Sequence, residues 1–149
     1  MRWMPLFCLT LALATPDGLA QTPSGSIPAP AVLAERAGRR FPQPVRVGDL
    51  PGRKVLAPAE SQPVLGHVAR LVRRADGSTT LTIRLAGWLG IGGRSVDVPI
   101  EAIGLLGEHV ALLDITPDQL RSLPDADPAV GTEIGRDDTI RVGLGKPFH

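Results

Sequence analysis

The chain has very little cysteine and few aromatic side chains. Its 149 residues include one cysteine, no tyrosine and three phenylalanines. A single cysteine cannot close an intrachain disulfide, and Cys8 lies in an apolar stretch that we expect to be removed during export. The mature chain would then have no thiolate nucleophile, and an oxidising compartment would leave it unchanged. Disulfide stabilisation and cysteine catalysis are therefore excluded for it.

A strong excess of charge of one sign is also missing. The 16 Lys and Arg residues nearly cancel the 15 Asp and Glu residues, which leaves a net charge of +1. Proteins that bind nucleic acid need basic residues to neutralise phosphates, so we expect no nucleic-acid partner. Prolines and glycines are abundant instead, at 15 and 17 residues. They indicate many turns and an all-β fold, and the length allows one small domain with appendages.

Residues 1–20 have the pattern of a secretory signal peptide. Arg2 supplies the positive charge, residues 6–14 form the apolar stretch, and Gly18 and Ala20 place small residues before a cleavage site. The apolar stretch is much shorter than the roughly 20 residues that span a bilayer, which favours cleavage over a membrane anchor. We therefore expect a mature chain that starts at Gln21 and is periplasmic or secreted.

Residues 21–44 are rich in Pro, Ser and Ala and are predicted to form a flexible tether. The segment lacks the apolar density that would offset the entropy of ordering, and only residues 31–40 suit a turn or two of helix. Its basic cluster of Arg36, Arg39 and Arg40 lies beside Glu35. Such a cluster is most often a solvated face, and the alternative is contact with an anionic membrane surface.

A domain is predicted over residues 45–124, and its clearest element is a β-hairpin. Residues 64–73 form a β-branched run, and Asp76-Gly77 is typical of a hairpin turn. In residues 80–85 the apolar side chains Leu81, Ile83 and Leu85 alternate onto one face. Residues 45–58 indicate two short strands around a Pro-Gly turn. Short and closely spaced strands are typical of a small closed barrel.

A third hairpin is expected after residue 95. We expect Val96, Val98 and Ile100 to face inward and their strand to pair with residues 109–115. The intervening residues 102–108 would form a short strand or edge and a turn at Gly107.

A short helix is predicted next, and an irregular tail after it. Thr116, Pro117 and Gln119 have the spacing of a capped helix start with proline at the first helical position. Leu120 and Leu123 form its apolar stripe, and residue 124 is a proline that ends it, so this helix would close one end of a barrel. Residues 125–149 are predicted to be irregular, with a strand only over residues 139–144.

Five segments in this order resemble one family. They are Gly52-Arg53-Lys54-Val55, Leu65-Gly66-His67-Val68, Asp76-Gly77, GWLGIGGRSVDVP at residues 87–99 and TPDQLRSLP at residues 116–124. Their order and spacing are similar to those of the PRC-barrel family, found in the H subunit of the photosynthetic reaction centre and in a ribosome maturation factor. The resemblance covers about residues 45–123. It departs at residues 60–63, where the family often has an acidic residue or a Gly-Glu pair before the Leu-Gly step.

The resemblance implies a small PRC-type β-barrel of short antiparallel strands with one short C-terminal capping helix. Family members are scaffolding and docking modules without a shared chemistry. It therefore implies a non-enzymatic interaction module with no cofactor. Neither photosynthesis nor ribosome assembly is carried over to this chain, because a fold does not determine a function.

The glycine-rich segment of residues 87–93 supplies the interface candidates. Trp88, Leu89 and Ile91 are large apolar side chains, and an exposed Trp flanked by aliphatic residues has the composition of an interface anchor. Arg94 and Asp97 would form the polar rim. The competing interpretation is that the three apolar side chains pack on their own core. A contact with a second copy of the chain would use the same residues.

No set of residues in the sequence requires catalysis or metal binding. The available acids, bases and nucleophiles are His67, Ser95, Asp97, Glu101, His109 and Asp114. Their spacing does not force them together, and two lone histidines on strands are seldom metal ligands. We therefore predict an exported module that docks a protein partner or itself, with no catalytic, cofactor or metal site. The alternatives are a peripheral membrane-surface protein and, with less support, a small-ligand, metal-binding or hydrolytic protein.

Overall fold

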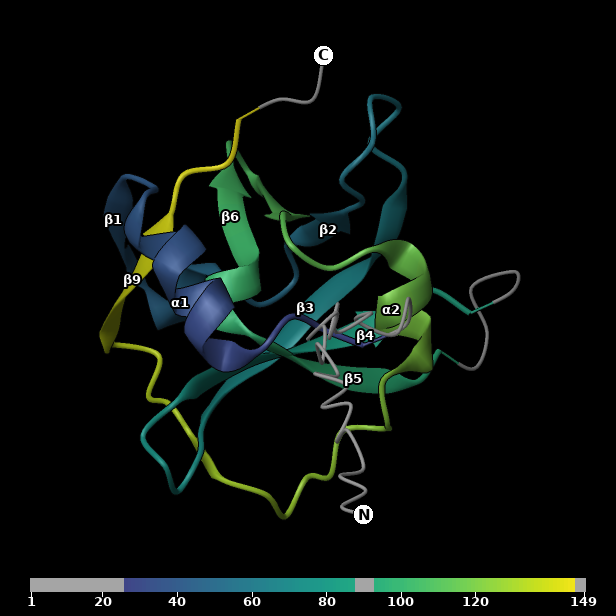
Figure 1. Cartoon of the computed structure of the whole chain (residues 1–149). Helices are drawn as coiled ribbons and strands as arrows, with labels where there is room; N and C mark the ends of the chain where they lie inside the picture. The colour runs from purple at the N-terminus through teal and green to yellow at the C-terminus, as the bar shows by residue number, and fades with distance from the viewer. Residues whose placement is uncertain (1–25, 88–92, 147–149) are drawn as a thin grey trace, which may run out of the picture.

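A computed structural model of the chain describes residues 26–87 and 93–146 (Figure 1). Strands dominate these residues and the helices are short, which agrees with the expected all-β class. In chain order the elements are α1 (Pro30–Gly38), β1 (Pro42–Arg46), β2 (Lys54–Leu56), β3 (Val64–Arg73), β4 (Thr79–Leu85), β5 (Ser95–Pro99), β6 (Ile103–Leu106), β7 (His109–Leu112), α2 (Pro117–Ser122), β8 (Thr132–Glu133) and β9 (Thr139–Gly143). Short 3-10 turns follow β1 and β5, at Val47–Asp49 and Ile100–Ala102.

Most strands belong to one sheet, in the order β5-β4-β3-β2-β7-β6, and β1 and β9 form a separate pair. Strand β8 pairs with the C-terminal end of β3. Neighbouring strands are antiparallel, except that β2 and β7 are parallel. Within the described residues the outer strands β5 and β6 do not pair with each other, so no closed barrel is found among them and the expected barrel stays a prediction. The chain just after β9 meets β6 through a bridge between Leu105 and Leu144.

The predicted central hairpin is confirmed. Strands β3 and β4 are antiparallel from Gly66 opposite Leu85 to Arg73 opposite Thr79. Gly77 in the connecting turn has a φ of 83°, which glycine adopts without steric cost. Leu81 and Ile83 are fully buried, as their alternation predicted. The sequence did not indicate that the other face of β4 is covered too, where Thr80 and Thr82 are buried.

The predicted third hairpin is wrong in its pairing. Val96 and Val98 are fully buried, but their strand β5 pairs with β4. Strand β7 pairs instead with β6, through a turn at Gly107, and with β2 on its other side. The reason lies at Pro99, which has no backbone N–H to continue a ladder and is followed by a 3-10 turn. Ile100 lies in that turn and packs against the core from outside any strand.

The predicted helix start is confirmed in α2. The side chain of Thr116 accepts a hydrogen bond from the backbone N–H of Gln119, and the side chain of Gln119 accepts one from the N–H of Thr116. Leu120 is buried and Leu123 packs against the core, so the apolar stripe faces inward. That α2 closes one end of a barrel stays a prediction, because no closed barrel is found among the described strands.

The structure differs from the expectation of a flexible tether over residues 21–44. Within that segment, α1 buries Leu33 in the core, and β1 pairs along its whole length with β9. The strand predicted in the tail is therefore present, and its partner is the segment that was predicted to be loose. Local composition hides this pairing because the two strands are separated by almost the entire domain.

The core is one cluster of aliphatic side chains drawn from the sheet, from both helices and from β9. Leu33 and Leu120 bring the two helices into it, and Ile140 and Val142 bring in β9. Within the described residues, no helix has both the length and the apolarity to cross a membrane.

Candidate functional site

A large hollow lies between the start of α1, the β3–β4 turn, β5 and residues 123–130. We call it the Asp97 groove. It encloses about 610 Å³. Binding sites for small ligands are typically clefts of roughly 300–1,000 Å³. The groove therefore has the size of a binding site, and segments distant in sequence build it.

Most of the groove wall is apolar. Its apolar lining residues are Ile27, Pro30, Ala34, Pro99, Leu123, Pro124, Ala126 and Val130. Pro30 and Ala34 belong to α1, so the groove exists only because the N-terminal segment folds against the sheet. Val130 also lines the groove and is 39% exposed, so part of the apolar wall faces the solvent.

Asp97 lies in the wall of the groove and is held on both sides. Its Oδ1 accepts a hydrogen bond from the Thr82 hydroxyl at 2.6 Å, and its Oδ2 forms an ion pair with Arg74 at 3.0 Å. The side chain of Asp97 is only 9% exposed. Asp97, which was expected on a polar rim, is instead a nearly buried side chain that fixes Arg74.

The other described interface candidate, Arg94, faces a different hollow. It forms an ion pair with Asp125 at 3.0 Å and donates a hydrogen bond to the carbonyl of Arg121. The hollow that it lines encloses about 260 Å³ and lies between the ends of β4 and α2. The structure thus does not bring Arg94 and Asp97 into one site. Trp88, Leu89 and Ile91 lie outside the described residues.

Three carboxylates line the Asp97 groove without an ion pair within the described part of the chain: Asp76, Glu101 and Asp127. Hydrogen bonds from the side chain and then the backbone of Ser78 lower the pKa of Asp76, which keeps it charged. Asp127 accepts a hydrogen bond from the backbone N–H of Ala129 at 2.8 Å. These three residues were not singled out as a group in the sequence, because nothing in their spacing brings them together.

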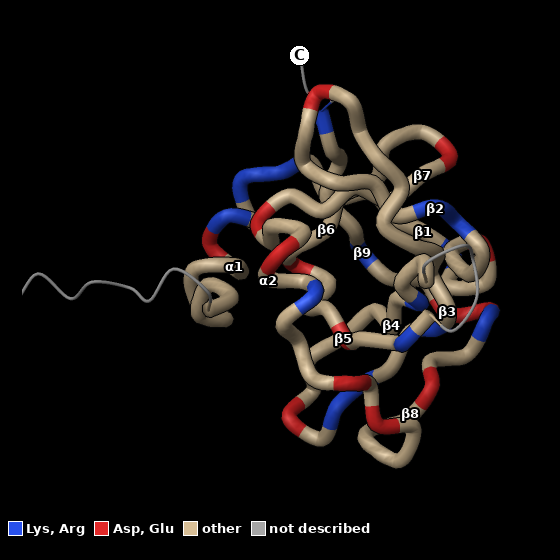
Figure 2. Tube along the Cα trace, turned by 90° about the vertical axis from the view of Figure 1, so that its right-hand side faces the viewer, with Lys and Arg blue, Asp and Glu red and all other residues tan. Residues whose placement is uncertain are grey.

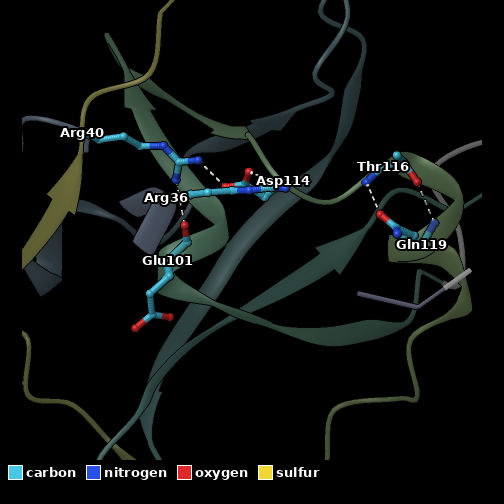
Figure 3. A network of polar contacts seen from close by, with 6 residues as sticks. All are labelled: Arg36, Arg40, Glu101, Asp114, Thr116 and Gln119. Carbon is cyan, nitrogen blue, oxygen red and sulfur yellow. Dashed lines mark hydrogen bonds and ion pairs between the residues drawn. The ribbon is translucent and has the colours of Figure 1, made fainter. Parts of the chain in front are cut away.

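Two arginines of the basic cluster, for which membrane contact was the alternative interpretation, are engaged in the fold (Figure 3). Arg36 and Arg40 both bind the carboxylate of Asp114, which is 7% exposed. Arg40 also donates to the carbonyl of Glu101 at 2.8 Å. Arg39 pairs with Glu35 one helical turn away at 2.5 Å. All three arginines therefore have acidic partners, and two of them attach the end of α1 to the sheet.

The histidines are not arranged as a metal site. His67 on β3 lies opposite Lys54 of β2 and Arg84 of β4, so its strand neighbours are cations. His109 begins β7, two strands away. Within residues 26–87 and 93–146, no three His, Cys, Asp or Glu side chains gather where they could hold a metal ion. Ser95 uses its backbone carbonyl to accept from Ala126.

No protein-family model, curated protein or solved structure matches the chain.

Proposed function

We propose that the protein is an exported, non-enzymatic docking module that binds a partner protein in the Asp97 groove. The observation that carries the proposal is the groove itself, an open, mostly apolar hollow of about 610 Å³ with acidic side chains around it. Apolar concave surfaces with a few placed polar groups are the usual form of binding sites. Export is supported by the signal-peptide pattern of residues 1–20.

The domain is proposed to be a divergent PRC-type barrel. Gly66, in the Leu-Gly step, supports this because an added Cβ would collide with the carbonyl oxygen of Arg84 on the paired strand. Gly93 has the same constraint against the carbonyl of Leu85. Two glycines that carry the resemblance are thus required by the close approach of the chain. In this proposal, β9 and β1 continue the barrel wall beyond β6. The bridge from Leu105 on β6 to Leu144 just after β9 supports this.

The two alternative functions have less support. A membrane-surface role would need Arg36, Arg39 and Arg40 to face lipid, but each has an acidic partner. A hydrolytic or metal-dependent role would need acids and bases in contact. Asp97 and Asp114 are instead neutralised by arginines in supporting positions.

The proposal is tested by site-specific photo-crosslinking in the exported full chain. A photoreactive amino acid replaces Val130, which lines the groove, and the matched control replaces His67 on the exposed part of β3. We expect a discrete adduct with a second protein from position 130 and none from position 67. Equal labelling at both positions, or no adduct at position 130, would contradict the proposal. A third probe at Trp88 tests the interface predicted for that loop.

A further inference from the structure

We infer that the partner presents a positively charged segment to the Asp97 groove, with Lys or Arg side chains beside apolar ones. This inference rests on the proposed docking function and adds the chemistry of the occupant. Three observations support it. The groove has an apolar wall, some of its carboxylates have no ion pair in the described residues, and the chain segments outside the described residues contain almost no Lys or Arg.

The apolar wall favours a chain segment over a free ion. It runs from Ile27 and Pro30 on one side to Leu123 and Val130 on the other. Lys and Arg side chains suit such a wall, because their methylene stems pack on apolar surface while the charged ends reach polar groups. A small cation gains nothing from these apolar contacts.

The charge of the lining residues determines the sign of the occupant. The lining contains five carboxylates and one basic side chain, Arg74. Arg74 is paired with Asp97, and Asp125 is paired with Arg94 at 3.0 Å. Glu101 and Asp127 have no ion pair in the described residues, whereas Asp76 accepts two hydrogen bonds from Ser78 and lies in the field of Arg74. Acidic positions gather at the end of the molecule near β5 and β8 in Figure 2.

Glu101 shows how the fold makes a carboxylate available. Its backbone carbonyl accepts from Arg40 at 2.8 Å, which fixes the main chain just after β5. Its carboxylate points away from Arg40 in Figure 3 and lines the groove. The arginine network therefore positions Glu101 through the backbone and leaves its side-chain charge unneutralised.

We expect the basic side chain to come from another molecule. Residues 1–25, 88–92 and 147–149, which lie outside the described part, contain Arg2 as their single Lys or Arg. Arg2 lies in the predicted signal peptide, which export removes. The residues that lead into the groove at Ile27, from Gln21 to Ser26, contain no basic side chain. Once the predicted signal peptide is removed, these segments thus offer the groove no Lys or Arg side chain.

The test selects ligands from a library of randomised short peptides displayed on phage, with the purified mature full chain as the target. We expect the selected peptides to be enriched in Lys and Arg relative to the input library. Their affinity is then measured for the double variant Glu101→Lys/Asp127→Lys. Glu60→Lys/Glu108→Lys is the matched control, because it changes the net charge equally but lies outside the groove. We expect about tenfold weaker binding to the groove variant and unchanged binding to the control.

The possible results separate this inference from the proposed function. Peptides without basic enrichment, or equal weakening by both double variants, would overturn the inference. An adduct from position 130 with an acidic or uncharged partner segment would overturn it too, while the docking function would stand. A self-adduct from position 130 would overturn the inference of a separate partner protein and would show that a second copy of the chain occupies the groove. If basic peptides bind as expected but position 130 gives no adduct in the exported protein, the proposed function fails instead.

Discussion

Two acidic regions of this molecule differ in what surrounds their carboxylates. Asp114 is 7% exposed and is bound by Arg36 and Arg40, so its charge is balanced by cations of the same chain. Glu101 and Asp127 line an open groove without an ion pair in the described residues. The first region joins the N-terminal helix to the sheet, and the second faces outward. The difference shows that burial and a fixed cation, which local sequence does not reveal, distinguish a structural carboxylate from one available for binding.

The largest loss of stability is expected when Asp114 is removed. We expect Asp114→Ala to lower the free energy of unfolding by about 3 kcal/mol, because it leaves the partly buried Arg40 without its main partner. Urea unfolding followed by circular dichroism measures the change. A loss below about 1 kcal/mol, the size of a surface ion pair, would show that the network is not structural.

The arginines of the same region provide a matched pair. Arg40 is 17% exposed and contacts both Asp114 and the Glu101 carbonyl, whereas Arg39 is 76% exposed and pairs only with Glu35 among the contacts that the structure describes. We expect Arg40→Ala to cost about 2 kcal/mol and Arg39→Ala less than about 0.5 kcal/mol. Similar losses in the two variants would contradict the assignment of Arg40 to the fold and Arg39 to the surface.

The groove carboxylates, in contrast, should contribute little to stability. Glu101→Lys/Asp127→Lys should change the free energy of unfolding by less than about 1 kcal/mol, because neither side chain has an ion pair in the described residues and Asp127 loses only an exposed hydrogen bond from the N–H of Ala129. The same unfolding assay checks this, with Glu60→Lys/Glu108→Lys as the reference. A loss as large as that of Asp114→Ala would make the groove carboxylates structural and remove the contrast between the two regions.

The smallest effect is expected at Asp76, which borders the groove on the β3–β4 turn. Its pKa is lowered in the folded chain, first by the hydrogen bond from the Ser78 side chain, so the ionised form favours the fold. That contribution is present above the unfolded pKa of about 4 and is lost as pH falls through the folded pKa. Asp76→Asn should therefore lower Tm slightly at pH 6 and reduce the fall in Tm between pH 5 and pH 2. An unchanged acid dependence in thermal scans would contradict this.

Local rules predicted the parts of the fold that local chemistry determines. The Asp76-Gly77 turn and the Thr116–Gln119 capping box each lie within a few residues, and both form as expected. The pairing of β1 with β9 and of β6 with β7 depends on which distant strands meet. Composition favoured a loose N-terminal segment because its one deeply buried apolar residue, Leu33, gives little signal alone.

The candidate site was predictable only in part. Asp97 was singled out from its side-chain type, and the structure places it in the groove wall with Arg74 and Thr82. Glu101 and Asp127 come from a 3-10 turn and from the tail, and α1 supplies the facing wall. No spacing rule joins three segments that the sequence separates by tens of residues. The interface predicted at Trp88, Leu89 and Ile91 stays a prediction.

The most direct measurement of the central claim is the yield of partner adduct from a photoreactive residue at position 130 in the exported chain. It is compared among the unaltered groove, the Glu101→Lys/Asp127→Lys groove and the Glu60→Lys/Glu108→Lys control. A groove that docks a basic segment of a partner protein predicts a discrete adduct that falls about tenfold only with the first double variant. The absence of an adduct from the unaltered groove would contradict docking at this site.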